Sequence, residues 1–324
     1  MKTVDEQSLI IKKKNKSAIQ DNISYTLMAL PVVIKTIIFS IVPLLWIGMA
    51  FQNYRGFLGI FGSPWVGLDH FINKFSDPVI WQYVWNTVGL NIMFIGIGTP
   101  LTVVMALFMY EMTNRTMTKL FQTIYFIPYL VSWTVAQWPI NNGLLGYETG
   151  MINNIIVSLG GSRIDFYSAS NGHMWPWILM LCNIWKGQGY SVIMYYASLQ
   201  SLDTEMLEAA DLDGANRFQK MWYISLAHLR KIVGIMLIMS MGGMLRSDFG
   251  LFWFIPNNDS SSETLYQATG VLDTYMYKLI MGAEGSNSFS VGTAVGLVQS
   301  VVGMIIMLVT NWIVKKLDEN AAFI

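Results

Sequence analysis

Residues 198–230, SLQSLDTEMLEAADLDGANRFQKMWYISLAHLR, form a polar stretch between two long apolar runs, and this alternation decides the fold. The flanking runs, 175–197 and 232–250, each approach the roughly 20 apolar residues that a helix needs to cross a bilayer. Hydrophobic residues make up 53% of the 324 residues, and charged residues only 12%. Because a soluble domain of this size could not bury so large an apolar share, we predict a membrane protein.

Apolar runs of similar length recur along the rest of the chain. Each is too long for a strand of a membrane barrel, which needs about ten residues, so every run is predicted to be a helix. The predicted fold class is therefore all-α, a polytopic membrane protein with about six transmembrane helices. The predicted spans are 32–51, 87–110, 120–140, 175–197, 232–250 and 291–314.

Basic residues gather on one side of this arrangement. Most of the 20 Lys and Arg residues lie before the first span, between spans two and three, between spans four and five, or after the last span. The positive-inside rule places these segments, and both termini, in the cytoplasm. The predicted organisation is a cytoplasmic N-terminal tail, 1–27, and a transmembrane domain, 28–324, with external loops near 52–86, 141–173 and 252–290 and a cytoplasmic loop near 198–230.

The polar stretch contains helix start and turn signals. Asp203 is a residue type that caps helix N-termini, and Glu205 and Glu208 complement the positive end of the helix dipole. Gly214 indicates a turn, after which apolar side chains resume over 215–224. We therefore predict two short helices at an angle. These residues alone leave two alternatives open, a docking piece for a partner protein and a solvated loop between two spans.

The spacing within this stretch resembles the EAA loop of type I ABC importer permeases. The shared features are Glu-Ala-Ala at 208–210, glycine at 214 and Ile-x-Leu at 224–226, while Ala227 stands where the family usually has proline. In that family the loop docks onto the ATPase. The resemblance thus implies a type I importer permease fold. It assigns ATPase coupling to Glu205, Glu208, Ala209, Ala210, Asp213, Gly214, Ile224 and Leu226.

Further segments resemble the carbohydrate branch of these permeases, which imports complex oligosaccharides and includes the larger permease of alginate importers. The resemblance implies import of an oligo- or polysaccharide, acidic as alginate is, by alternating access across the inner membrane of a bacterium. The similar segments are FGSPWVGL at 61–68, WKGQGY at 185–190, YYASLQ at 195–200, VLDTYMY at 271–277 and AVGLVQS at 294–300.

The same resemblance implies a set of partners. They are a second homologous permease, two ATPase subunits that form a homodimer, a substrate-binding protein outside the membrane, and membrane lipid. ATP and Mg are then used by the ATPase subunits, and this chain is expected to bind no cofactor. The sequence agrees in one respect, because it contains no Gly-x-x-x-x-Gly-Lys-Ser/Thr loop that would hold a nucleotide phosphate.

Metal and nucleic-acid chemistry are not expected either. His70, His173 and His228 are far apart in the sequence and do not have the spacing of metal ligands. The formal net charge is zero, which gives no indication of a nucleic-acid partner. We therefore predict a transport subunit that is not an enzyme.

Lys186 lies about 18 Å into its predicted span, near the middle of the bilayer, if the helix rises about 1.5 Å per residue. A cation at that depth is costly unless it faces a polar cavity or a partner inside the bundle. Both alternatives stay open. In the first, its charge favours an acidic sugar, and neighbouring amide and aromatic side chains bind hydroxyl groups and sugar rings. The predicted substrate-path residues are Asn183, Trp185, Lys186, Gln188, Tyr190 and Arg246.

Arg246 and Asp248 lie near the outer end of the fifth span, where snorkelling or a mutual ion pair is a simpler explanation of these charges than a substrate site.

Two other functions are alternatives to the importer permease. A secondary sugar transporter would need an acidic ion-coupling group, and no Asp or Glu lies within the core of a predicted span. A membrane enzyme of polysaccharide metabolism would need paired carboxylates or a metal cluster, and the external acidic residues form no such pattern.

Overall fold

The computed structural model of the protein describes residues 22–258, 262–282 and 288–317. Within these ranges every regular element is a helix, and the one β-type pairing is an isolated bridge between Gln52 and Trp65. The predicted all-α fold is therefore confirmed. Four helices are long and apolar enough to cross a membrane: Asn22–Phe51, Pro78–Glu111, Arg217–Gly242 and Ser288–Lys316.

Six uniform spans, however, are not confirmed, because two of the predicted spans are built differently. The fourth is the unbroken helix α8 (Trp175–Leu199), which lies where it was predicted but contains a lysine and several amide and hydroxyl side chains. Helix α8 is consequently less apolar than the four helices named above.

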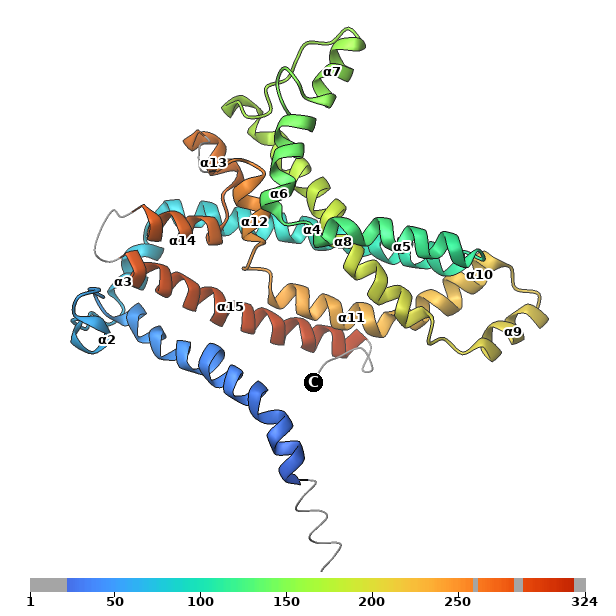
Figure 1. Ribbon diagram of the computed structural model, residues 1–324, viewed down its shortest axis with the longest axis horizontal. Coiled ribbons are helices and arrows are strands. Elements are labelled where there is room, and N and C mark those ends of the chain that lie inside the picture. Colours follow the sequence, from blue (N-terminus) through green and yellow to red (C-terminus); the bar gives the residue numbers. More distant parts are fainter. Residues whose placement is uncertain (1–21, 259–261, 283–287, 318–324) are drawn as a thin grey trace, which may run out of the picture.

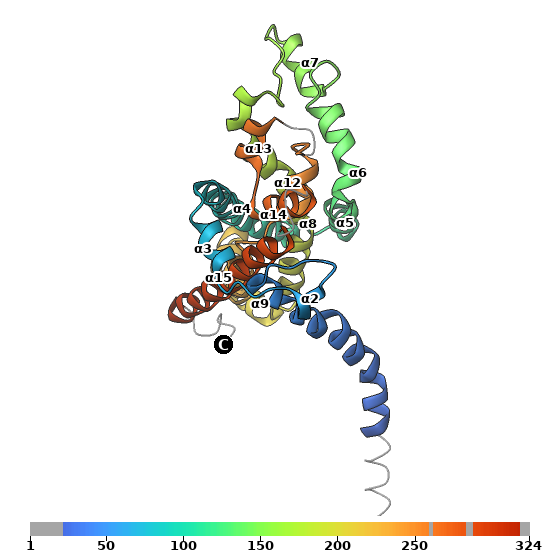
Figure 2. The same cartoon turned by 90° about the vertical axis from the view of Figure 1, so that its left-hand side faces the viewer.

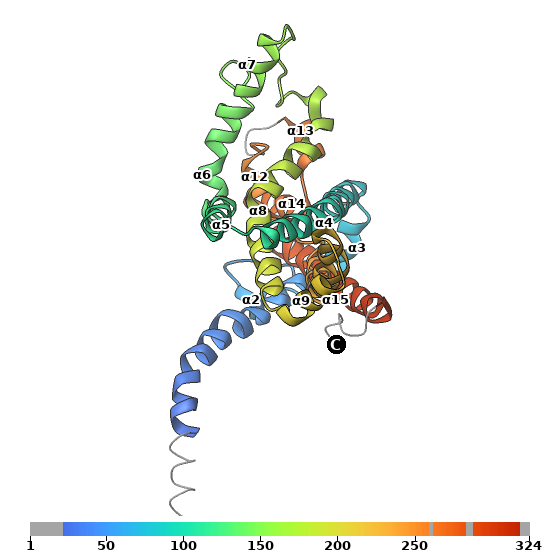
Figure 3. The ribbon, with the colours of Figure 1, turned by 90° about the vertical axis from the view of Figure 1, so that its right-hand side faces the viewer.

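The prediction of one continuous third span over 120–140 is wrong. Helix α5 (Arg115–Leu130) ends two residues after Pro128, and α6 (Trp133–Trp138) then leaves the bundle at a steep angle to α5, as Figures 1 and 3 show. The backbone is extended at Ser132, whose side chain accepts a hydrogen bond from the Val135 N–H and so starts the new helix. Pro128, which has no N–H, weakens the last turns of α5, and the capping serine permits a new helix to start here.

The fifth span also differs from its predicted limits, 232–250. Helix α11 (Leu226–Gly242) ends at a pair of glycines, and a short helix, α12 (Phe249–Phe254), follows after Asp248, whose side chain caps it. At its other end, α11 continues without a break from α10 (Arg217–Lys220) and the π-helical turn η5 (Met221–Ser225). The separate short helix predicted over 215–224 is instead the beginning of the fifth membrane helix, because no proline interrupts 217–242.

Buried apolar side chains join α8 to its neighbours in two clusters. One cluster lies near its N-terminal half, where Leu179 packs with Phe94 of α4 (Pro78–Glu111) and Phe252 of α12. The other lies near its C-terminal half, where Val192 packs with Ala106 of α4 and Leu229 of α11. Helix α8 is therefore the central helix of the bundle.

The first helix, Asn22–Phe51, packs on α15 only through its C-terminal part, whereas its N-terminal part lies apart from the bundle (Figures 1 and 2), and none of its most apolar stretch is buried within the chain.

The two ends of the bundle differ. Helix α9 (Thr204–Leu212) lies at one end, and α2 (Gly59–Gly62), α3 (Asp69–Phe75) and α14 (Leu272–Met281) gather at the opposite end (Figure 1). The remaining elements are η1 (Ile37–Ile41), η2 (Val42–Phe51), η3 (Pro139–Leu144), α7 (Met151–Ser158), η4 (Ala169–Met174), α13 (Glu263–Thr269) and α15 (Ser288–Leu317).

The close approach of α5 and α8 depends on Gly189. A Cβ atom at this position would clash with the backbone of Tyr125 on α5, whereas one at Gly187 would come no nearer than 3.8 Å to another group, the side chain of Asn183. We therefore expect Gly189→Ala to lower the stability of the protein by about 1–3 kcal/mol, as overpacking does elsewhere. The measurement is thermal unfolding of the purified protein, with Gly187→Ala as the matched control. Equal stability of the two variants would contradict this packing.

Candidate functional site

Helix α9 forms the exposed tip of the polar segment. The Asp203 carboxylate accepts a hydrogen bond from the Glu205 N–H over 2.9 Å, which confirms the predicted N-cap. After the helix, Gly214 adopts a left-handed conformation with φ +77°. A side chain would be strained there, which explains why glycine occupies the turn. The chain then reverses into α10, and Asn216 begins that helix with a capping box to Gln219.

An ion pair fixes α9 relative to the fifth membrane helix. The Lys220 Nζ lies 2.6 Å from the Asp211 Oδ1, and the Ala215 N–H donates to the Ala210 carbonyl over 2.9 Å. At the other side, His228 Nε2 lies 3.0 Å from the Ser198 carbonyl, where α8 ends. These contacts join the polar segment to the ends of two membrane helices.

The predicted coupling residues are mostly accessible. Glu205, Glu208, Ala209, Asp213 and Gly214 are exposed, whereas Ala210, Ile224 and Leu226 are half-buried, and Leu226 packs on the cluster that contains Leu229. The structure also shows exposed apolar side chains that were not predicted as coupling residues. These exposed side chains are Met206, Leu212, Phe218, Trp222 and Tyr223. The sequence signal that could have identified them is the presence of large apolar residues in an otherwise polar loop. We call this set, together with Glu208, the α9–α10 surface.

Lys186 contacts the end of α5. Its Nζ lies 3.4 Å from the Tyr129 carbonyl, 5.5 Å from the centre of the Tyr129 ring and 5.1 Å from that of Trp133. The break after α5 leaves carbonyl groups without helical partners, and a cation is stabilised at such a C-terminus. Lys186 thus has partners within the chain, although it is only half-buried. We call Lys186, Tyr129, Trp133 and Tyr190 the Lys186 cluster.

Aromatic rings extend this cluster along one side. Tyr190 stacks on Tyr129 with ring centres 5.5 Å apart, and Phe126 stacks on Tyr129 at the same distance. Of the other predicted path residues, Trp185 is exposed and Asn183 is half-buried. Gln188 is half-buried against Gly98 of α4, where a Cβ would lie 2.5 Å from its Nε2. The structure therefore unites Lys186 and Tyr190 but turns Gln188 toward helix packing.

Trp133 joins the two broken helices. Its indole N–H donates to the Asp248 Oδ2 over 2.6 Å, and Gly250 leaves room for its ring. Neither Trp133 nor Tyr129 was predicted as a site residue, because their position beside Lys186 depends on the unpredicted break between α5 and α6.

Of the two alternatives for Arg246 and Asp248, snorkelling and a mutual ion pair, the ion pair is absent from the described residues. Arg246 is exposed and donates from Nη2 to the Ser300 hydroxyl of α15 over 3.1 Å, whereas Asp248 pairs with Trp133. The reason is the end of α11 at Gly242, which puts the two side chains on an irregular segment rather than on one helix. The predicted path residue Arg246 therefore lies against α15, and no contact joins it to Lys186.

The segment after α11 is held by buried polar groups. The Asp273 carboxylate accepts from the Ser247 N–H over 2.7 Å, and Gln299 donates to the Leu245 carbonyl over 2.8 Å. Burial raises the pKa of Asp273, although the hydrogen bond from Ser247 and the nearby charge of Arg246 act in the opposite direction. No group of three or more His, Cys, Asp or Glu residues that could hold a metal ion was found among the described residues.

The chain matches a family model described as "binding-protein-dependent transport system inner membrane component" over residues 98–320. The matched range contains α5, α8, the α9–α10 surface and all of α15. The chain belongs to this family. As a member it is a multi-pass inner-membrane permease of an ABC importer, so the predicted transport subunit is confirmed, and the alternatives of an enzyme and a secondary transporter are not supported.

Two proteins of Bacillus subtilis are similar to this chain over most of its length. The chain is 33% identical to the polygalacturonan/rhamnogalacturonan transport system permease protein YteP of Bacillus subtilis, over 100% of both chains. It is 34% identical to the protein LplB of the same organism, over 92% of this chain and 90% of that protein.

Two solved structures have the same fold. One belongs to a bacterial ABC transporter involved in the import of the acidic polysaccharide alginate, with a TM-score of 0.80 and 27% identity over 94% of this chain and 99% of that chain. The other is a bacterial alginate ABC transporter in complex with an alginate pentasaccharide-bound periplasmic protein, with a TM-score of 0.79 and 27% identity. It covers 93% of this chain and 97% of that chain. The predicted type I importer permease fold is thereby confirmed.

Proposed function

We propose that this permease imports oligosaccharides derived from acidic polysaccharides by alternating access. The main support is the full-length similarity to a polygalacturonan/rhamnogalacturonan permease, together with the fold shared with an alginate importer. All three of these named polymers include uronic acids. The Lys186 cluster offers a cation and stacked aromatic rings beside an accessible surface, which suits an anionic pyranose.

The proposed assembly contains a second homologous permease, a homodimer of ATPase subunits and an external substrate-binding protein. Two surfaces of the chain support it. The apolar first helix buries none of its most apolar stretch within the chain, so it is available to lipid and to a second permease. The exposed apolar side chains of the α9–α10 surface suit a protein partner rather than water.

We propose that α9 transmits the ATPase cycle to the membrane domain. ATP and Mg act in the ATPase subunits, and closure of those subunits moves α9. The Lys220–Asp211 ion pair links α9 to the helix Arg217–Gly242, which is 26 residues, or about 39 Å, long. The far end of that helix leads to Asp248, which bonds to Trp133 of the Lys186 cluster. A rigid helix between two contacts can convert movement of α9 into opening of the path.

The coupling role predicts a specific defect in Glu208→Lys. Reversal of its charge places a cation against the basic partner group that we propose on the ATPase, so ATP hydrolysis should no longer respond to substrate-loaded binding protein. We expect about a tenfold loss of stimulated ATPase activity in the reconstituted complex, which corresponds to about 1.4 kcal/mol. Glu148→Lys, an exposed acid on the other side, is the control. Normal stimulation in Glu208→Lys would refute the coupling role.

The proposed orientation puts α9 and both termini in the cytoplasm. In a Cys182→Ala background, Ser162→Cys should react with a membrane-impermeant thiol reagent added to intact spheroplasts, because residue 162 is exposed in a proposed external loop. Thr113→Cys, exposed between α4 and α5, should react only after the membrane is permeabilised. The reverse labelling pattern would overturn the orientation.

Lys186→Met separates a substrate role from a packing role. If the charge attracts an acidic sugar, uptake of trigalacturonate should fall about tenfold while uptake of neutral maltotriose, if the complex carries it, is unchanged. If the charge serves the end of α5, thermal stability should fall and every substrate should suffer alike. Uptake is measured in proteoliposomes and normalised to assembled complex. Wild-type complex that carries neutral but no uronate oligosaccharides would refute the proposed substrate class.

A further inference from the structure

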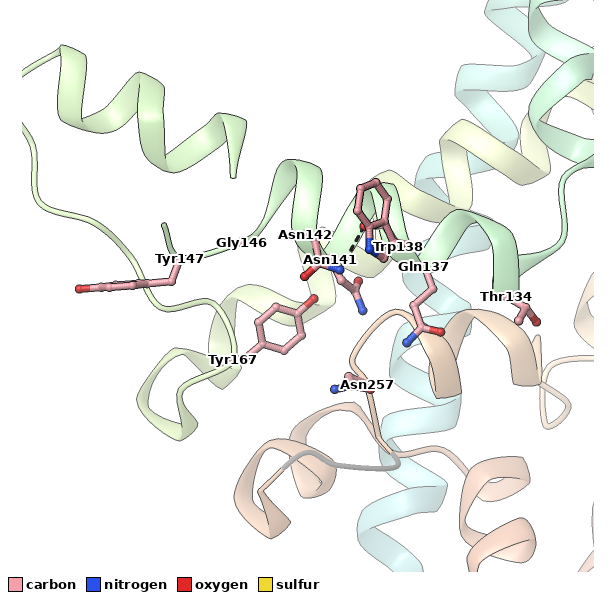
Figure 4. A pocket seen from close by; sticks show the side chains of 9 residues that line it. All are labelled: Thr134, Gln137, Trp138, Asn141, Asn142, Gly146, Tyr147, Tyr167 and Asn257. Atoms are coloured by element: carbon pink, nitrogen blue, oxygen red, sulfur yellow. Dashed lines mark hydrogen bonds between the residues drawn. The ribbon is translucent and has the colours of Figure 1, made fainter. Parts of the chain in front are cut away.

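A cleft lies above the Lys186 cluster, between α6–η3 and the loop after α12, and none of the predicted site residues lines it. Its volume is about 510 Å³, and Figure 4 shows the side chains around it. The lining residues that carry the argument are Thr134, Gln137, Trp138, Asn141, Tyr167 and Asn257.

One wall of the cleft is a single face of α6 and η3. Four lining residues are separated by three, four and seven positions, which puts them on the same side of a helix. The opposite side of these helices packs into the core through Trp133, Ala136 and Ile140. The lining face consists of Thr134, Gln137, Trp138 and Asn141. The helix therefore presents polar and aromatic groups to the cleft while it is anchored on its other side.

The other wall is held by buried hydrogen bonds. Asn258 donates to the Phe252 carbonyl over 2.7 Å and accepts from the Thr269 hydroxyl over 3.1 Å. These bonds fix the loop that contains Asn257, whose backbone is left-handed with φ +56°. Asn141 Nδ2 reaches across the cleft to the Phe254 carbonyl over 3.3 Å. The cleft is thus largely preformed, so a ligand would not have to order it.

The groups in the cleft match the hydroxyl groups and ring faces of a sugar. The Asn141 Oδ1 is buried and has no hydrogen-bond partner within the described chain, so a ligand hydroxyl in the cleft would reach it only after the Asn141 side chain turns. The Gln137 and Asn257 amides supply further donors and acceptors, and the Trp138 ring is 70% exposed. No charged side chain is among the residues that line the cleft. A carboxylate or phosphate would therefore find no counter-ion there.

We propose that this cleft is an outer subsite for the uncharged hydroxyl and ring faces of an oligosaccharide. The proposal rests on the proposed function, since it concerns the path of the same substrate. Trp138 follows Trp133 by five residues, about 7 Å along the helix. The cleft and the Lys186 cluster thus lie near one another along α6 but on different faces of it, and successive parts of one saccharide would meet them in turn. The cleft would read the sugar ring and the cluster its charge.

The test uses the full complex in nanodiscs, without the binding protein, and trigalacturonate as the probe. Trp138→Ala removes the aromatic face, and Asn257→Gly removes an amide from the other wall without backbone strain, because glycine tolerates the left-handed conformation. Saturation-transfer NMR should show about a fivefold to tenfold weaker binding in each variant. Trp177→Ala, which removes a similarly exposed tryptophan outside the cleft, should bind as the wild type does. The difference in binding between the wild type and the cleft variants should also persist in high salt, because no charged side chain lines the cleft.

Three outcomes would overturn the proposal. Unchanged probe binding in both cleft variants excludes a saccharide subsite. Weaker docking of the binding protein with unchanged probe binding makes the cleft a protein contact. Lower thermal stability alone makes Trp138 a membrane-interface anchor. The proposed function is judged separately, by uptake in the wild-type complex, so it survives if uronate uptake is normal while the cleft variants behave as the wild type.

Discussion

The hydrogen bond between the Trp133 indole and the Asp248 carboxylate joins two interrupted helices, and the arrangement of the bundle depends on it. Both interruptions fall in segments apolar enough to be predicted as single spans. Hydrocarbon provides no hydrogen-bond partners, so a broken helix is tolerated only where the protein itself satisfies the freed backbone groups. One interruption follows Leu130 and the other follows Gly242, and the bond brings them side by side.

The freed groups at both interruptions have identifiable partners. Lys186 serves the Tyr129 carbonyl, Gln299 serves the Leu245 carbonyl, and Asp273 serves the Ser247 N–H. These partners come from α8 for the first break and from α14 and α15 for the second. Polar side chains that would be costly in an apolar environment are thus used to hold irregular backbone in place. Of these groups, Lys186 also belongs to the proposed substrate path.

In the proposed mechanism, the α9–α10 surface and the interrupted helices are the two ends of one mechanical connection. The helix Arg217–Gly242 begins beside the α9–α10 surface and ends at the segment that leads to Asp248. This chain and the matching chain of the alginate transporter differ at nearly three quarters of their residues and keep the same overall fold, as a TM-score of 0.80 at 27% identity indicates. Different cargoes on a common fold are expected when function depends on local sites placed on that fold.

Composition and the long apolar runs determined the membrane class, and the spacing around Glu208 and Gly214 indicated the family, because hydrophobicity and helix signals are local properties of the chain. The N-cap at Asp203 and the turn at Gly214 were predictable for the same reason. Tertiary structure alone decided that the third span breaks at Ser132, that the fifth ends at Gly242, and that Trp133 and Tyr129 surround Lys186. Where an apolar segment stops being helical depends on whether distant side chains can satisfy its backbone, and that is settled only when the helices pack.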